Sequence, residues 1–161
     1  MPIHYITTTS IFSVPRKSVL VVSVDCSGST FRGPATTIQA QLLEQFPHVC
    51  ETYGSHCQSH LPSQLMGTSL LIQEQNYWIA LLFTHNTRDH IDTNVVVNTT
   101  RTAVIDLIRK LHSHSFICTL VPGDEYFPTL HLERLNMDVI HWKYSESALA
   151  TVPFNFHVYN F

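Results

Sequence analysis

The sequence predicts a single α/β domain, residues 1–161, in which one sheet carries helices on both faces. Two observations lead to this fold class. Runs of β-branched and aromatic residues alternate along the chain with segments in which apolar residues recur at helical spacing. In addition, 44% of the residues are hydrophobic and only 13% are charged, as expected for a chain that buries a core. No repeat, low-complexity tract or linker interrupts this pattern.

The strand candidates are apolar runs bounded by turn residues. Ser18–Val24 is a near-continuous β-branched run, which is typical of a central strand buried on both faces of a sheet. Ser69–Ile72 and Tyr77–Thr84 have the pattern of two strands joined by a polar turn. The shorter candidates are Ile3–Ile6, Ser115–Val121, Val139–Trp142 and, inside an apolar tail over Ser145–Phe161, an extra C-terminal strand at Phe154–Tyr159.

Two longer segments have apolar residues at helical spacing. The first should end near Phe46-Pro47, and its apolar face consists of Ile38, Leu42, Leu43 and Phe46. The second should begin at Asn98, a residue type that caps helix N-termini, and its apolar face consists of Val104, Leu107, Ile108 and Leu111. Between the two, Tyr53-Gly54-Ser55 has the composition of a helix stop. A short helix is expected at Thr129–Asn136.

Charge and segment length argue against two classes of partner. The net charge is −3 with neutral histidines, and nine Lys and Arg residues provide no global field for nucleic acid or an anionic membrane. The longest apolar stretches, Val19–Val22 and Tyr77–Phe83, are far shorter than the roughly 20 residues of a membrane span. Because the N-terminus lacks the pattern of a secretory signal, we expect a cytoplasmic or nuclear protein with free cysteine thiols.

Three loops should carry any ligand site, because ligands of such folds bind beyond the carboxyl ends of the strands. These loops are Asp25–Gly33, Thr84–Asp92 and Pro122–Pro128. In the first, Ser27-Gly28-Ser29-Thr30 offers hydroxyl and backbone N–H groups before a helix, and Arg32 could add a charge-assisted contact with an anion. The segment fits neither a P-loop nor a dinucleotide fingerprint, so an ordinary strand-to-helix connection remains the alternative.

The second loop contains histidines and carboxylates that could act as general bases. His85 and His90 are the candidate bases, and Asp89 and Asp92 the carboxylates. A serine hydrolase is disfavoured because the Gly-x-Ser-x-Gly elbow is absent. A metal site is disfavoured too, because the spacing does not give zinc geometry in the one cluster rich in metal-binding residue types, which consists of His48, Cys50, His56, Cys57 and His60.

Several segments in combination resemble a known family. Val19–Gly33, the helix after it and His48–Tyr53 resemble the first half of a macro domain, most closely the fungal ADP-ribose 1″-phosphate phosphatase type. In that type an Asn-Cys-x-Gly-Ser segment and a glycine-rich loop follow the strand. Tyr77–Thr84 resembles the family's strand that ends in Leu-Phe-Thr, and Thr99–Leu111 resembles the next helix. The resemblance covers about Ile3–Lys143.

The resemblance implies both a fold and a function. The fold is a three-layer α/β/α arrangement with a mixed sheet. The function is binding of ADP-ribose or a related nucleotide, with hydrolysis of ADP-ribose 1″-phosphate or an ADP-ribosyl ester as the associated activity. Asp25 falls at the distal-ribose position, and His85 or Asp124 would help to activate water. The other implied ligand-binding residues are Ser10 at the adenine, Ser27, Gly28, Ser29, Arg32, Gly33, Thr84, Asn86 and Arg88 in the phosphate loops, and Gly123, Tyr126 and Phe127 in the last loop. No metal or cofactor is implied.

Several of these positions depart from the family pattern. Asp25 replaces an asparagine and places a negative charge near an anionic ligand. Phe31-Arg32-Gly33 replaces three glycines, so that Arg32 would supply by charge what backbone donors supply in the family. The segment His85–His90 lacks the usual glycines. These losses leave a second function open, namely a catalytically inactive macro-fold module that binds a protein partner through the apolar tail Ala148–Phe161.

Overall fold

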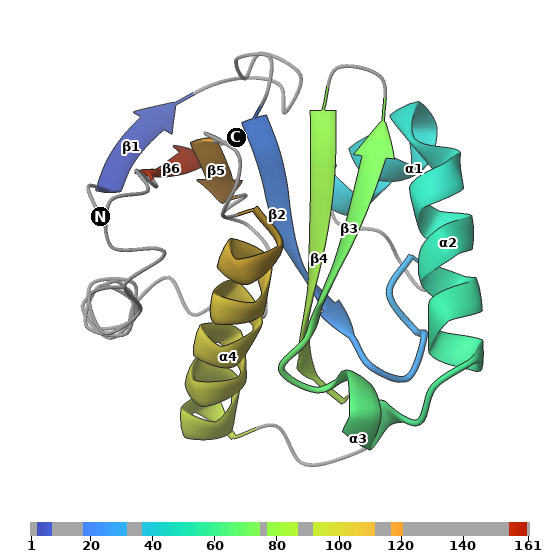
Figure 1. Cartoon of the computed structure of the whole chain (residues 1–161). Coiled ribbons are helices and arrows are strands. Elements are labelled where there is room, and N and C mark those ends of the chain that lie inside the picture. The colour runs from blue at the N-terminus through green and yellow to red at the C-terminus, as the bar shows by residue number, and fades with distance from the viewer. Residues whose placement is uncertain are drawn as a thin grey trace.

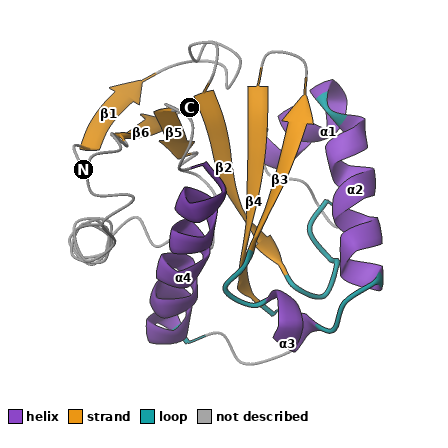
Figure 2. Ribbon diagram, in the orientation of Figure 1, coloured by secondary structure: helices purple, strands orange, loops and turns teal. Residues whose placement is uncertain are grey.

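The chain folds as one sheet with helices packed against it (Figure 1). The computed structural model describes residues 3–7, 18–31, 37–74, 77–86, 92–111, 117–120 and 155–160, and the statements below concern these residues. The helices, purple in Figure 2, are α1 (Thr37–Gln45), α2 (Pro47–Gln58), α3 (Pro62–Leu65) and α4 (Thr93–Leu111). The strands are β1 (Ile3–Thr7), β2 (Ser18–Asp25), β3 (Ser69–Glu74), β4 (Tyr77–His85), β5 (Ile117–Leu120) and β6 (Asn155–Asn160). Within the described residues the strand order is β1-β6-β5-β2-β4-β3.

The middle of the sheet confirms the prediction made from the β-branched run. β2 pairs in parallel with β4 on one side and with β5 on the other, while β3 pairs with β4 in the antiparallel direction. The β2 residues Val19–Val22 and Val24 are at most 2% exposed. A strand this completely buried needs cover on both faces, and the mixture of parallel and antiparallel pairs makes the sheet a mixed one.

Alternate side chains of the central strands enter two separate helical layers. Leu20, Val22 and Val24 of β2 belong to the core cluster that contains the buried residues of α1, α2 and α3. The residues on the helical side of this cluster are Leu42, Val49, Tyr53, Leu65 and, between α1 and α2, Phe46. On the opposite face α4 packs against β4 and β3. Its buried side chains there include Val104, Leu107, Ile108 and Leu111. The three-layer α/β/α architecture is therefore confirmed.

The C-terminal strand lies inside the sheet. β6 pairs in parallel with β1 on one side and with β5 on the other, so Phe156 is in register with both Ile3 and Cys118. The expected strand at Phe154–Tyr159 therefore exists, at Asn155–Asn160. Its backbone edges are occupied on both sides, and in this segment the chain does not form a separate tail.

Two helix boundaries differ from the sequence predictions. α2 continues through Tyr53-Gly54-Ser55 as far as Gln58, because the buried Tyr53 anchors this part of the helix in the core. α4 begins at Thr93 and contains Asn98 in its interior. Asp92 is the residue that caps α4, since its carboxylate accepts a hydrogen bond from the Asn94 N–H at 2.8 Å.

None of the described helices combines the length and the hydropathy that crossing a bilayer requires. The predicted strand Val139–Trp142, the predicted helix Thr129–Asn136 and the loop Pro122–Pro128 lie outside the described residues.

Candidate functional site

The carboxyl ends of β2 and β4 bring two of the predicted loops together. The strands run parallel, and a register shift after Val24 sets Asp25 opposite His85. The Cys26 N–H continues this pairing by donating to the His85 carbonyl oxygen at 2.8 Å. Asp25 and His85, which are 60 positions apart in the sequence, thus become neighbours at the edge where ligands bind in this class of fold.

A tight turn over Asp25–Phe31, which we call the β2 turn, follows the strand. The Ser27 N–H and hydroxyl both donate to Asp25 Oδ1, and the Asp25 N–H donates to Thr30 Oγ1 at 2.9 Å. Gly28 has φ 87° and Phe31 has φ 71°, so two of its residues adopt the left-handed region. For a residue with a side chain, such as Phe31, that region costs roughly 1–2 kcal/mol, and the surrounding contacts must offset this cost.

Asp25 and His85 form a buried polar pair at the base of the β2 turn. Asp25 is 1% exposed and His85 is 4% exposed, and Asp25 Oδ2 lies 4.0 Å from His85 Nε2. On its other side, His85 Nδ1 lies 2.9 Å from Thr84 Oγ1. Burial lowers the pKa of His85 to about 4, and the nearby Asp25 carboxylate opposes this shift only in part. His85 is therefore neutral at pH 7.

The imidazole of His85 is within hydrogen-bond distance of its chain neighbour Thr84, through Nδ1 and the Thr84 hydroxyl. Which of these two groups donates depends on the tautomer of the imidazole. Thr84 is fully buried, and its carbonyl oxygen in turn accepts from Thr99 Oγ1 of α4 at 2.8 Å. The backbone at the end of β4 is thus held from α4.

Tyr53 is the residue of this region that sequence reasoning missed. It projects from α2 and is 1% exposed. Its hydroxyl donates to the Asp25 carbonyl oxygen at 2.7 Å and accepts from the Thr30 N–H at 3.3 Å. Its ring stands edge-to-face on Phe31 at 5.6 Å and stacks on Phe83 at 6.1 Å. The only local signal was that Tyr53 is the last residue of the resembling segment His48–Tyr53, and this does not indicate a contact with residue 25.

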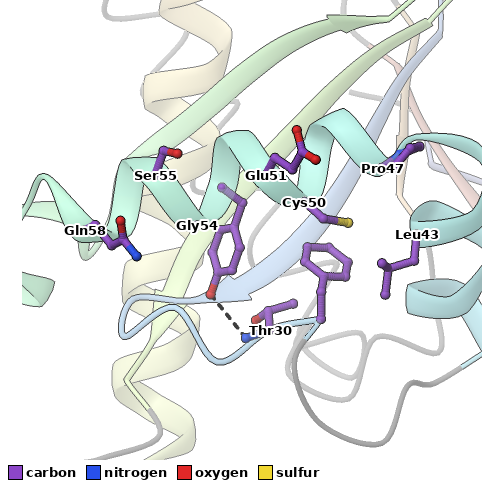
Figure 3. Close-up of a pocket in the computed structure, with 10 residues that line it drawn as sticks. Thr30, Leu43, Pro47, Cys50, Glu51, Gly54, Ser55 and Gln58 are labelled. Atoms are coloured by element: carbon purple, nitrogen blue, oxygen red, sulfur yellow. Dashed lines mark hydrogen bonds between the residues drawn. The ribbon is translucent and has the colours of Figure 1, made fainter.

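Two grooves run between the β2 turn and α2. The larger, of about 460 Å³, is shown in Figure 3, where Thr30 lies across from Glu51, Gly54 and Gln58 of α2. The smaller, of about 220 Å³, is lined from the turn by Cys26, Ser27 and Gly28. Its other walls are Gly54, Cys57 and Gln58 of α2 together with Pro62. Gly28 lies close to α2, since a Cβ added there would stand 3.4 Å from Cys57 Cβ.

The cysteines and histidines of α2 do not gather into a metal-binding cluster. Within the described part of the chain, no three His, Cys, Asp or Glu side chains are placed to hold an ion. His56 and His60 stack on each other with ring centroids 4.4 Å apart. Cys26 contacts Met66 Sδ at 3.8 Å, and burial raises the pKa of its thiol to about 12, so it stays protonated.

The structure brings together part of the predicted ligand set. The described members are Asp25, Ser27, Gly28, Ser29, Thr84, His85 and Asn86, all at the carboxyl ends of β2 and β4. Ser29 is exposed, and Asn86 is half-buried. The predicted residues that lie outside the described part of the chain are Ser10, Arg32, Gly33, Arg88, Gly123, Asp124, Tyr126 and Phe127.

Comparison with known proteins identifies the fold. No protein-family model matches the sequence, and no curated protein matches it. Among solved structures, the macrodomain of Mycobacterium tuberculosis DarG has a TM-score of 0.68 at 15% identity, covering 98% of this chain and 96% of that one. A macrodomain protein from Streptomyces coelicolor has a TM-score of 0.63 at 14% identity, covering 99% of both chains. Thermosipho africanus DarTG in complex with ADP-ribose has a TM-score of 0.58 at 13% identity, covering 89% of this chain and 38% of that one. The chain therefore has the macrodomain fold.

Proposed function

We propose that this chain binds ADP-ribose, or a nucleotide that carries an ADP-ribosyl group, at the carboxyl ends of β2, β4 and β5. One observation carries the proposal: the β2 turn and the buried Asp25–His85 pair meet at that edge of the sheet. The fold adds support, because a similar fold occurs in a DarTG protein solved with ADP-ribose. Crevices at the carboxyl ends of strands are the usual ligand sites of α/β sheets.

We assign the diphosphate to the outer part of the β2 turn. Ser27 already donates its N–H and its hydroxyl to Asp25, so its part is to fix that carboxylate. Gly28 and the exposed Ser29 are the described residues that would approach the phosphates, and glycine permits a close backbone approach. Arg32 and Arg88, both outside the described residues, would add charge-assisted hydrogen bonds.

We assign the distal ribose to Asp25. Hydroxyl groups of a ribose can donate, and a carboxylate accepts only, so the two are complementary. The side chain is almost completely buried, so the sugar would have to lie directly against the turn. Ser10 would contact the adenine, and Tyr126 or Phe127 would stack on the adenine or a ribose, in segments outside the described residues.

For turnover we propose the activity of the fungal phosphatase type or of an ADP-ribosyl ester hydrolase, with His85 or Asp124 activating water. A neutral His85 can accept a proton, which supports this role. Its pKa of about 4 makes it a weak base at pH 7, so we expect slow hydrolysis beside clear binding. The alternative of docking a protein through the C-terminal tail has less support, because residues 155–160 are paired on both sides.

Isothermal titration with ADP-ribose tests the binding proposal. We expect micromolar affinity for the wild type and a loss of at least tenfold for Arg32→Ala, because a charge-assisted contact with a phosphate would be removed. Arg109→Ala, which removes an exposed arginine of α4, is the matched control and should bind like the wild type. No heat of binding and no thermal stabilisation at millimolar ADP-ribose would refute the proposal.

Two assays test the hydrolase proposal. One measures release of phosphate from ADP-ribose 1″-phosphate, and the other measures release of ADP-ribose from an ester-linked peptide. Loss of turnover with retained ADP-ribose affinity in His85→Gln or Asp124→Asn would identify the base. Binding without any turnover by the wild type would leave a catalytically inactive binding module.

A further inference from the structure

The β2 turn is tied at both of its ends by a single side chain from another element. The Tyr53 hydroxyl of α2 donates to the carbonyl of Asp25 and accepts from the N–H of Thr30. The dashed line that ends at Thr30 in Figure 3 is the second of these hydrogen bonds. Inside the turn, the Asp25 N–H donates to Thr30 Oγ1. One hydroxyl therefore closes a ring of hydrogen bonds through residues 25 and 30.

The turn needs this support because its backbone is strained. Phe31 adopts φ 71°, a left-handed conformation that residues with a side chain seldom adopt, directly after Thr30. The Tyr53 ring packs edge-to-face against the Phe31 ring at 5.6 Å. Tyr53 thus contacts the strained residue through its ring and the two ends of the hydrogen-bonded loop through its hydroxyl.

Tyr53 is placed to act through the turn and not on a ligand. Its side chain is 1% exposed, and both of its hydrogen bonds go to backbone groups of the turn. Burial raises the pKa of its phenol, so the hydroxyl stays protonated near neutral pH. The ring is held independently by stacking on Phe83 of β4, so loss of the hydroxyl leaves the aromatic packing in place.

We propose that Tyr53 is a positioning residue for the ligand site, whose hydroxyl fixes the β2 turn in the conformation that receives the nucleotide. This inference rests on the proposed function, because it assigns the turn to the distal ribose and the phosphates. Without the hydroxyl, the turn samples other conformations, and a ligand must then select the competent one. The apparent affinity of the ligand is then its intrinsic affinity multiplied by the fraction of time for which the turn is competent.

Tyr53→Phe tests this proposal because it removes the hydroxyl and keeps the ring. We expect a tenfold weaker affinity for ADP-ribose in isothermal titration and at least tenfold faster hydrogen–deuterium exchange in peptides that cover the β2 turn. Ser69→Ala is the matched control. It also removes a buried hydroxyl, which donates to Asp106 Oδ2 of α4 at 2.7 Å. The control should lower the melting temperature by a similar amount and leave both the ligand affinity and the exchange of the turn at wild-type values.

The possible results separate positioning from general stability. Faster exchange in the turn together with an affinity loss confined to Tyr53→Phe supports the proposal. Unchanged exchange in the turn, or equal affinity losses in Tyr53→Phe and Ser69→Ala, overturns it. If the wild type itself binds no ADP-ribose, the proposed function fails, and the exchange comparison of the free proteins still decides whether Tyr53 holds the turn.

Discussion

The buried histidine at the end of β4 should make the protein less stable in mild acid. The ordinary pKa of histidine, 6.5, applies to the unfolded chain, whereas burial lowers the pKa of His85 to about 4 in the folded protein. Between these two values the unfolded state binds a proton and the folded state does not. The free energy of unfolding is therefore highest above pH 6.5 and falls as the pH drops toward 4.

The size of this effect follows from the separation of the two pKa values. Each unit of pKa difference corresponds to about 1.4 kcal/mol. From pH 8 to pH 5, the protonation of unfolded His85 should lower the free energy of unfolding by about 2 kcal/mol. Urea unfolding at the two pH values measures this quantity if the transition is two-state.

His85→Gln isolates the contribution of this residue because glutamine fills a similar space and does not titrate. The variant should lose about 2 kcal/mol less than the wild type between pH 8 and pH 5. His48→Gln, at an exposed position of α2, controls for the substitution itself. Equal losses in the wild type and in His85→Gln would refute a buried neutral histidine. A wild type that gains stability relative to His85→Gln on acidification would indicate instead an ion pair with Asp25.

The remaining predictions concern the β2 turn. Asp25→Asn should raise the affinity for ADP-ribose roughly fivefold in isothermal titration, because about 1 kcal/mol of repulsion between the carboxylate and the diphosphate disappears, while the amide oxygen can still accept from a ribose hydroxyl. Weaker binding would show that the ribose contact depends on the negative charge of Asp25. Gly28→Ala and Gly67→Ala should each lose about 1 kcal/mol of stability, since both residues have positive φ and the new methyl groups would stand 3.4 Å from Cys57 and 3.2 Å from Thr102. Only Gly28→Ala should also weaken ADP-ribose binding, and equal affinities in the two variants would contradict the assignment of the turn to the ligand.

The central strands could be predicted from sequence because their signal is local. The run Ser18–Val24 and the segment Tyr77–Thr84 each end within one residue of β2 and β4. A β-branched run of this length has few alternatives to a buried strand, so the predicted strands match the observed ones. The extra strand near the C-terminus was found in the same way, but its place between β1 and β5 depends on pairings that no local pattern contains.

The helix boundaries were harder to predict because tertiary contacts override local preferences. Tyr53-Gly54-Ser55 has the composition of a stop, yet the buried Tyr53 side chain keeps α2 helical through it. α4 begins with Thr93 and contains three consecutive valines, which are poor helix formers. Val96 and Val97 are nevertheless buried, so tertiary packing stabilises this turn of the helix despite the low helix propensity of valine.

The sequence predicted that the loops after β2 and β4 lie at the same edge of the sheet, but it did not predict the contacts within them. Asp25 and His85 were both candidates, but their separation of 4.0 Å follows from the register of β2 with β4. The two hydrogen bonds of Tyr53 join residues 23 and 28 positions apart in the sequence. Spacing rules that work within one helix or strand cannot find such contacts.

The place of β6 has a consequence for the order in which the protein can fold during synthesis. β2, β3 and β4 lie within residues 18–85 and can pair as soon as that segment has left the ribosome. β1 is made first, but the partner strand that the structure describes for it is β6, whose residue Phe156 aligns with Ile3. β1 must therefore wait until residues 155–160 have been made, and contacts so distant in sequence form slowly. Until then β1 carries unpaired backbone groups, and a chaperone that recognises a nascent strand would have its longest opportunity there.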